Sequence, residues 1–183
     1  MFKVGLQIDG EWSEHSHPPV FQVDKRVGHM SKIIATAPGS DPLVFHRLSE
    51  CLEPPLILLY LLHTPRGEGE AGRYQSPDLT RSALKVFLER FDGFLRADAR
   101  FDLWVHSPAD HATVVWDRHN LIHAYGRTDC VARTLRSIGF HEGEPIIPTP
   151  HTHYYHQAFD TDAKAVISYF PWVRSVLQPG DEQ

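Results

Sequence analysis

The sequence has few cysteines and no long apolar segment. Its two cysteines, Cys51 and Cys130, match no CxxC or CxxxC spacing. We therefore expect two reduced core thiols, and neither a disulfide framework nor a cysteine-ligated zinc site. The longest apolar run, Leu56 to Leu62, is far shorter than the roughly 20 residues of a membrane-spanning helix. The first residues also lack the pattern of a secretion signal, so we expect a cytoplasmic protein without a membrane partner.

An excess of basic residues is also missing. Lysine and arginine number 18 against 23 aspartates and glutamates, which gives a net charge of -5. Proteins that bind nucleic acid rely on neutralising phosphates with positive charge. Arg127, Arg133 and Arg136 are the one local exception, and their spacing fits the solvated face of a helix. We therefore expect no nucleic-acid partner.

The composition is that of an ordinary globular protein. Apolar residues make up 42% of the 183 residues and charged residues 22%. The frequent prolines and glycines before Pro54 indicate a β-rich N-terminal segment, residues 1–53, packed on or continuous with the rest. We expect the main α+β domain at residues 54–178 and a polar tail at residues 179–183.

Apolar alternation and short runs of β-branched or aromatic residues predict the strands. These are residues 2–8, 20–23, 32–36, 43–48, 56–62, 101–106, 112–117, 121–125 and 145–147. Three helices are expected: one opened by Ser76 and Pro77, one from Asp129 to Gly139, and one from Asp160 or Thr161. Because strands cluster and helices lie between the clusters, the fold class is α+β. We expect a mainly antiparallel sheet with about three helices, packed as a two-layer domain.

The 13 histidines of the chain stand out in its composition. In an extended segment, His151 and His153 would point to the same side. His156 would join them only if the chain bends after Tyr154. A further ligand would have to come from elsewhere, and the candidates are His123, His141 and Asp160. The competing interpretation is that these are surface histidines that pair with local backbone and tyrosines.

The segment from His63 to Gln75 reads as a long loop and contains a GxGxxG pattern. Its context does not fit a dinucleotide site, because the helix opens later and two glutamates would repel phosphate. Arg66, Arg73 and Tyr74 could clamp a carboxylate, since arginine suits such fork-shaped pairing. The alternative is that they pair with the acidic residues nearby, which are Glu68, Glu70 and Asp78.

A polar turn, Asp117-Arg118-His119, connects two of the expected strands. The trio has the composition of an acid-base site, but sequence neighbours on a strand alternate faces and rarely converge. We therefore interpret it as a turn. Trp116 and His119 remain candidate binding residues, because tryptophan is favoured at interfaces as well as in cores.

Two functional hypotheses follow. The first is a non-catalytic binding or regulatory protein that contacts a protein partner or a second copy of itself, with no cofactor. The second is a zinc-dependent hydrolase with His151, His153 and His156 as ligands, because zinc lowers the pKa of bound water enough for attack at neutral pH. Its candidate bases are Glu142, Glu144 and Asp160. Whether the chain is an enzyme is left open.

Overall fold

The structure is a computed structural model that describes residues 1–24 and 31–181. It has an α+β fold with a large sheet, as the sequence predicts. The strands are β1 (Val4–Ile8), β2 (Glu11–Glu14), β3 (Val20–Asp24), β4 (Lys32–Thr36), β5 (Ile57–Leu62), β6 (Gly72–Gln75), β7 (Phe101–Ser107), β8 (Ala112–Trp116), β9 (Leu121–Tyr125), β10 (His141–Glu142), β11 (His151–His153) and β12 (Val173–Ser175). The helices are α1 (Pro42–Ser49), α2 (Arg81–Arg90), α3 (Asp92–Ala97), α4 (Thr128–Ser137) and α5 (Asp160–Ile167), with short 3-10 turns at Pro38–Ser40, Gln157–Phe159 and Pro179–Asp181.

The larger sheet has nine strands in the order β10-β3-β4-β9-β8-β7-β5-β6-β12. Neighbouring strands are antiparallel except β10 and β3, which run parallel. The strands β3 and β4, from the N-terminal segment, pair into the same sheet as the strands that follow Pro54. Alternate side chains such as Leu58, Tyr60 and Val105 are fully buried in one core cluster with the helices.

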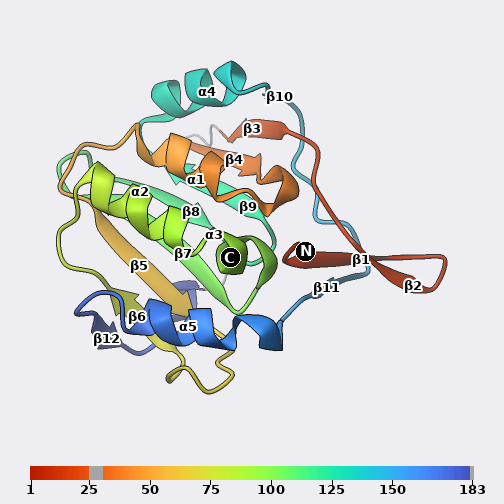
Figure 1. The fold of residues 1–183 in the computed structure, drawn as a ribbon. Helices are drawn as coiled ribbons and strands as arrows, with labels where there is room; N and C mark the ends of the chain where they lie inside the picture. The colour runs from red at the N-terminus through yellow and green to blue at the C-terminus, as the bar shows by residue number, and fades with distance from the viewer. Residues whose placement is uncertain (25–30, 182–183) are drawn as a thin grey trace.

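Helices α1, α2 and α3 pack together over the sheet face that is turned toward the viewer in Figure 1. The strand expected at residues 43–48 is wrong, because this segment is α1. Asp41 caps the helix by accepting a hydrogen bond from the Leu43 amide at 3.0 Å, and Pro42 occupies the first turn. Proline there needs no amide partner, so it starts a helix where it would interrupt a strand.

The expected number of helices is too low. The helix that was expected to open at Ser76 begins at Arg81, after the Thr80 cap, and is interrupted at Phe91 before α3. Residues 145–147, expected as a strand, have no regular structure, and the short strand β10 lies just before them. Of the expected tail, residues 182 and 183 lie outside the described residues.

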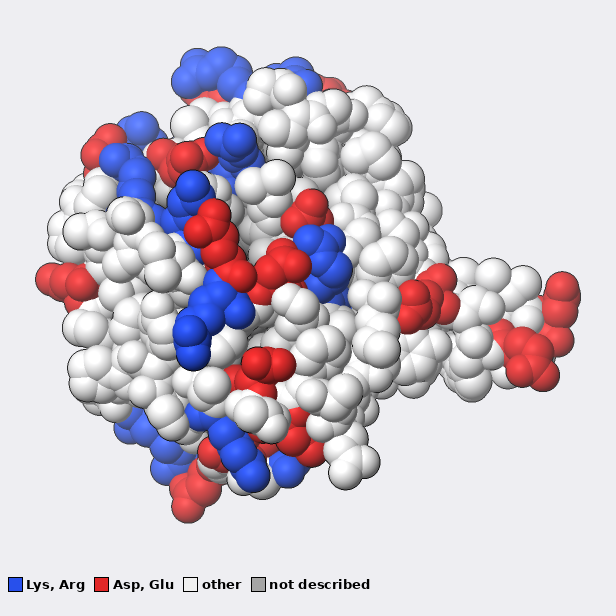
Figure 2. Space-filling view, viewed as in Figure 1, with Lys and Arg blue, Asp and Glu red and all other residues white. Residues whose placement is uncertain are grey.

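The smaller sheet has three strands in the order β11-β1-β2. The β1–β2 hairpin projects from the body of the molecule, and β11 runs along its root (Figure 1). On the face drawn in Figure 2, this arm shows acidic side chains and no basic ones. The two sheets meet where β11 approaches the turn between β8 and β9.

Cys51 and Cys130 form a disulfide, so the expectation of two reduced thiols is wrong. The bond joins the segment just after α1 to the first turn of α4, and the two cysteines are 79 positions apart in the sequence. Spacing along the chain gave no indication of this pair, because only the tertiary fold brings the two residues together. Among the described residues, no helix has the length and apolar character needed to cross a membrane.

Candidate metal centre

The turn between β8 and β9 is shaped by Asp117. Its Oδ1 accepts hydrogen bonds from the backbone amides of His119 and Leu121, both at 2.9 Å. Its Oδ2 accepts a hydrogen bond from His123 Nε2 at 3.0 Å and lies 3.9 Å from His119 Nδ1. Burial raises the pKa of the Asp117 carboxyl, but the hydrogen bond and charge of His123 outweigh it and lower the pKa below its usual value. Asp117 is therefore a buried carboxylate that fixes both the backbone and the surroundings of His119.

Two further contacts hold the tip of this turn. Asn120 has a left-handed φ of 63°, which asparagine tolerates well, and its side chain bonds to Trp116 and Ser40. The buried ring of His17 lies against the turn, with Nε2 3.0 Å from the His119 carbonyl oxygen. Because a carbonyl only accepts, His17 is the donor. The position of His119 is thus fixed from two sides.

His151 and His153 come from β11. This strand pairs with β1 in a register that places His153 opposite Val4 and His151 opposite Leu6. As expected for residues two apart on a strand, both imidazoles lie on the same side. The amide of Tyr154 donates to the Lys3 carbonyl at 2.8 Å, which ties the end of β11 to β1.

The rings of His119, His151 and His153 converge. Their centroids lie 4.7 Å apart for His119 and His153, and 5.4 Å apart for the other two pairs. One potential ligand nitrogen from each ring lies within 4.8 Å of the other two. Among the described residues, this is the one group of three or more histidine, cysteine or acidic side chains that could hold a metal ion.

Two of the three histidines of the cluster are in the neutral form that metal binding requires. Burial, followed by the charges of His119 and Arg118, lowers the pKa of His153 to about 4. Burial also lowers the pKa of His119. Metal ions bind the neutral imidazole, so neither ring has to lose a proton near pH 7.

The free ring nitrogens also suit a metal ligand. His153 Nε2 is buried and has no hydrogen-bond partner in the structure. Its lone pair or proton is therefore not engaged by another protein group and is free for a ligand. His151 Nδ1 donates to the Pro148 carbonyl at 3.1 Å, which leaves the lone pair of a neutral ring on Nε2. A second-layer acceptor of this kind is typical of metal-binding histidines.

The spacing is compatible with a tetrahedral ion after a small contraction. Zinc–nitrogen bonds of about 2.0 to 2.1 Å place tetrahedral ligands about 3.3 Å apart. The three nitrogens lie within 4.8 Å of one another. Rotations of the three rings would therefore have to bring them closer by up to about 1.5 Å. Three protein ligands with one open position are the pattern of catalytic zinc sites.

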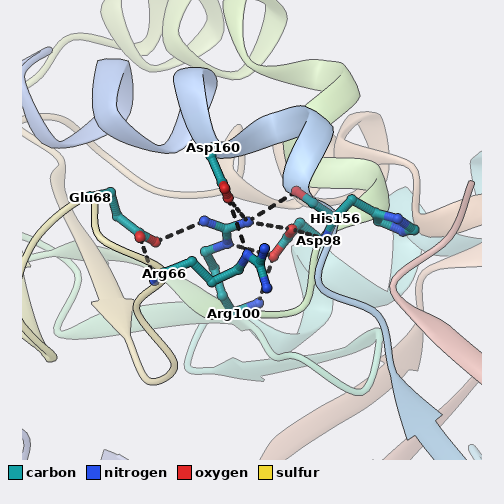
Figure 3. Close-up of polar contacts among 6 residues, drawn as sticks. All are labelled: Arg66, Glu68, Asp98, Arg100, His156 and Asp160. Atoms are coloured by element: carbon teal, nitrogen blue, oxygen red, sulfur yellow. Dashed lines mark hydrogen bonds and ion pairs between the residues drawn. The ribbon is translucent and has the colours of Figure 1, made fainter.

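A buried arginine anchors the chain that follows β11. Arg100 is fully buried and donates to Asp98 at 2.8 Å, to Glu68 at 3.0 Å and to Asp160 at 3.0 Å (Figure 3). Asp98 also accepts the backbone amide of His156 at 2.9 Å, and Arg100 donates to the His156 carbonyl at 3.3 Å. The Gly-rich loop thus contributes a carboxylate, Glu68, to an internal ion network. Because Arg100 is fully buried and already paired with three carboxylates, it is not presented to a phosphate from solvent.

The Gly-rich segment's own polar residues are also engaged. Arg66 Nε lies 3.2 Å from Asp160, and Arg73 Nε lies 3.7 Å from Asp181. Tyr74 is buried, and its hydroxyl donates to a backbone carbonyl of the loop at 2.7 Å. A free carboxylate would have to displace these contacts in order to bind here.

The other expected site residues lie apart from the three-histidine cluster. Trp116 is fully buried against α1, so its indole is not displayed at the surface. His156 is not a member of the cluster, and its ring points away from the Arg100 network in Figure 3. Of the expected bases, Glu142 pairs with Arg136, and Asp160 belongs to the Arg100 network. Glu144 is exposed in the stretch after β10.

All three histidines are candidates in the sequence, but no local pattern brings His119 together with the other two. His119 lies in a polar turn, and the additional ligand expected from the sequence was His123, His141 or Asp160. Only the pairing of β11 with β1 carries His151 and His153 to that turn. The chain matches no protein-family model, no curated protein and no solved structure, so its function has to be inferred from the geometry of the site.

Proposed function

We propose that the chain binds a divalent metal ion through His119, His151 and His153, and that zinc is the ion that suits it best. The observation that carries the proposal is the convergence of three imidazoles, one of which has a buried nitrogen without a partner. Nitrogen ligands suit zinc and other late transition metals better than magnesium or calcium, which prefer oxygen. The sequence led us to expect the ligands His151, His153 and His156. The proposed site has His119 in place of His156.

Three protein ligands would leave the fourth position of a tetrahedral ion to water. Zinc lowers the pKa of such a water to about 7, so that hydroxide is present at neutral pH. The function that follows is metal-assisted hydrolysis. Asp117 would act as a positioning residue for His119, since it lies 3.9 Å from His119 Nδ1 and is not itself one of the three ligands.

The test is a metal titration of the untagged full-length chain after treatment with EDTA. We expect one zinc or cobalt ion per chain, and a visible cobalt spectrum of tetrahedral type. His119→Ala, His151→Ala and His153→Gln should each lose this binding. His141→Ala is the matched control, because His141 is exposed and outside the cluster. No bound ion at equimolar supply, or equal losses in the control, would refute the proposal.

The projecting β1–β2 arm supports the first functional hypothesis, a protein-binding role, as a second candidate. Ile8 and Trp12 are 53% and 48% exposed on this arm, and β2 forms one edge of its sheet. An exposed strand edge can accept a strand from a partner or from a second copy.

We also infer a two-layer packing for the main domain, because Trp104 and His106, on the face of the sheet away from the core cluster, are only half-buried.

Sedimentation of the chain alone tests whether the partner is a second copy of the chain and not a different protein. A dimer that Trp12→Ser dissociates would support self-association through the arm. Val176→Ser, which alters an exposed apolar residue near the C-terminus, should leave the sedimentation of the chain unchanged.

The cytoplasmic location stays a prediction, and the Cys51–Cys130 disulfide favours an oxidising compartment instead.

A further inference from the structure

The sheet face away from the core cluster carries a hollow over β5, β6, β7 and β8. Tyr60 of β5 points into the core, so Ile57 and Leu59 lie on the other face. The register places His106 opposite Ile57 and Trp104 opposite Leu59. Together with side chains of β6 and β8, these residues line a hollow of about 270 Å³. Ligand pockets usually measure about 300 to 1,000 Å³, so this one suits a small ligand.

One part of the lining is apolar. Ile57, Leu59 and Trp104 all line the hollow, and each is half-buried. An indole and two branched aliphatic side chains offer a ring or a compact hydrocarbon group a contact surface that excludes water. This part of the lining therefore favours a ligand with an apolar body.

The other part of the lining has hydrogen-bond donors that are not in use. Arg73 and Gln75 lie on the same face of β6, opposite Leu61 and Leu59. In the described part of the chain, the terminal nitrogens of Arg73 and the side-chain amide of Gln75 have no hydrogen-bond partner. The buried Nε1 of Trp104 also lacks an acceptor. Among the described residues, no aspartate or glutamate lines the hollow.

These donors select the charge of the ligand. A carboxylate only accepts hydrogen bonds, and its two oxygens match the fork of an arginine. Asp181 lies 3.7 Å from Arg73 Nε and offsets part of its charge, which favours a monoanion over a phosphate dianion. A carboxylate at the two terminal nitrogens leaves this contact in place. Tyr74, which the sequence suggested as a partner of Arg73, points to the opposite face of β6 and is buried in the core.

We propose that this hollow binds a small carboxylate with an apolar body, such as an aromatic acid. The apolar body lies against Trp104, Leu59 and Ile57. The carboxylate accepts hydrogen bonds from the terminal nitrogens of Arg73 and from the amide of Gln75. None of the three histidines of the candidate metal centre lines the hollow, so the inference does not depend on a bound metal.

The probe is benzoate, added to the EDTA-treated chain so that binding to a metal ion does not contribute. Benzamide keeps the ring without the charge, and acetate keeps the charge without the ring. Nitrogen–proton NMR spectra follow the indole signal that Trp104→Phe removes. We expect benzoate to shift this signal in a saturable way. Benzamide and acetate should bind at least about tenfold more weakly, because each lacks one of the two sets of contacts.

Three variants test the residue that is assigned to the carboxylate. Arg73→Gln should weaken benzoate binding by about tenfold to a hundredfold, the usual effect of losing hydrogen bonds to a charged group. Arg73→Lys keeps a positive charge beside Asp181 but lacks the fork, so its affinity should be intermediate. Arg174→Gln is the matched control. Arg174 lies on β12, pairs with Glu70 and does not line the hollow, so this variant should bind benzoate as the natural chain does.

Several outcomes would overturn the inference. The first is the absence of a saturable shift with benzoate. The second is equal affinity for benzamide and benzoate, which would show that the charge is not recognised. The third is unchanged benzoate affinity in both Arg73 variants. N-acetylglucosamine is a further arm, because sugar rings also stack on tryptophan, and its binding in the absence of benzoate binding would assign the hollow to a neutral ligand. None of these outcomes affects the metal site, which is tested with zinc and cobalt.

Discussion

The ring of Tyr154 lies directly against the backbone of Gly5. A Cβ atom at Gly5 would lie 2.6 Å from Tyr154 Cζ, which is closer than real Cβ contacts allow. Gly5 is in β1, and Tyr154 immediately follows His153 in the paired strand β11. The glycine therefore allows β11, with its two candidate ligands, to lie close to β1.

Gly5→Ala should displace Tyr154 and shift β11 away from the β8–β9 turn. We expect a clear loss of zinc affinity, by tenfold or more if the shift approaches 1 Å, since about 1.4 kcal/mol corresponds to a factor of ten. Calorimetric titration with zinc measures it. Gly180→Ala is the control, because a Cβ there meets nothing within 4 Å. Equal zinc affinity in both variants would contradict the role assigned to Gly5.

Asp117→Asn tests the carboxylate that supports His119. Asparagine keeps an oxygen for the amides of His119 and Leu121, so the turn should persist. It removes the negative charge near His119, and loss of an outer-layer partner typically lowers metal affinity about 10- to 100-fold. Zinc titration measures the change. Asp110→Asn, in the turn between β7 and β8, is the matched control, and a similar effect in both would contradict the prediction.

The sequence predicted those elements whose signal is local. The expected strands 32–36 and 121–125 coincide with β4 and β9, because period-two alternation is a property of the strand itself. The segment 43–48 was misread, because a proline there fits either a strand boundary or the first turn of a helix. Only the Asp41 cap decides between them.

The site was predictable only in part, for the same reason. The shared side of His151 and His153 follows from strand geometry. Their approach to His119 depends on the β1–β11 pairing, and no local pattern encodes a contact between such distant segments.

The buried network around Arg100 predicts that replacing Asp98 lowers the free energy of unfolding much more than replacing Glu70 does. Asp98→Asn would remove one of the negative charges that neutralise the fully buried Arg100. It would also weaken the hydrogen bond that Asp98 accepts from the His156 amide, which holds the chain after β11 in place. Breaking a buried ion pair typically costs about 3 to 5 kcal/mol. Glu70→Gln alters an exposed pair with Arg174 and should cost at most about 1 kcal/mol. Urea unfolding of both variants measures the difference, and equal midpoints would refute it.

The disulfide predicts a stability that depends on redox state. In the chain-entropy description, a loop closed by residues separated by 79 positions contributes up to about 4.5 kcal/mol. Replacing Cys51 and Cys130 together by serine should lower the free energy of unfolding by a comparable amount, measured by urea unfolding without reductant. In the natural chain, reductant should produce most of the same loss. If reductant has no effect on the natural chain, the cysteines are not bonded in solution.

Lys3 gives the stability a pH dependence of defined sign. Its ammonium is fully buried over the rings of Trp116, 3.6 Å away, and Phe101, 4.4 Å away. Burial lowers the pKa of Lys3 from 10.5 to about 7, although the charges of Asp102, Asp117 and Asp98 oppose the change. Between these two values the unfolded chain binds a proton that the folded chain does not. The contribution of Lys3 to the free energy of unfolding therefore rises from pH 7 to pH 10.5 and is lost as pH falls back toward 7.

Lys3→Met removes this dependence while it keeps the length of the side chain. The two pKa values, 10.5 and about 7, correspond to an upper limit of about 5 kcal/mol in the difference between the natural chain and the variant over that range. Urea unfolding of the EDTA-treated proteins at several pH values measures it without interference from metal binding. Titration of the buried Tyr60 hydroxyl, whose pKa burial raises, affects both proteins alike and cancels in the difference. A difference that stays constant from pH 7 to 10.5 would mean that Lys3 titrates equally in the folded and unfolded chains.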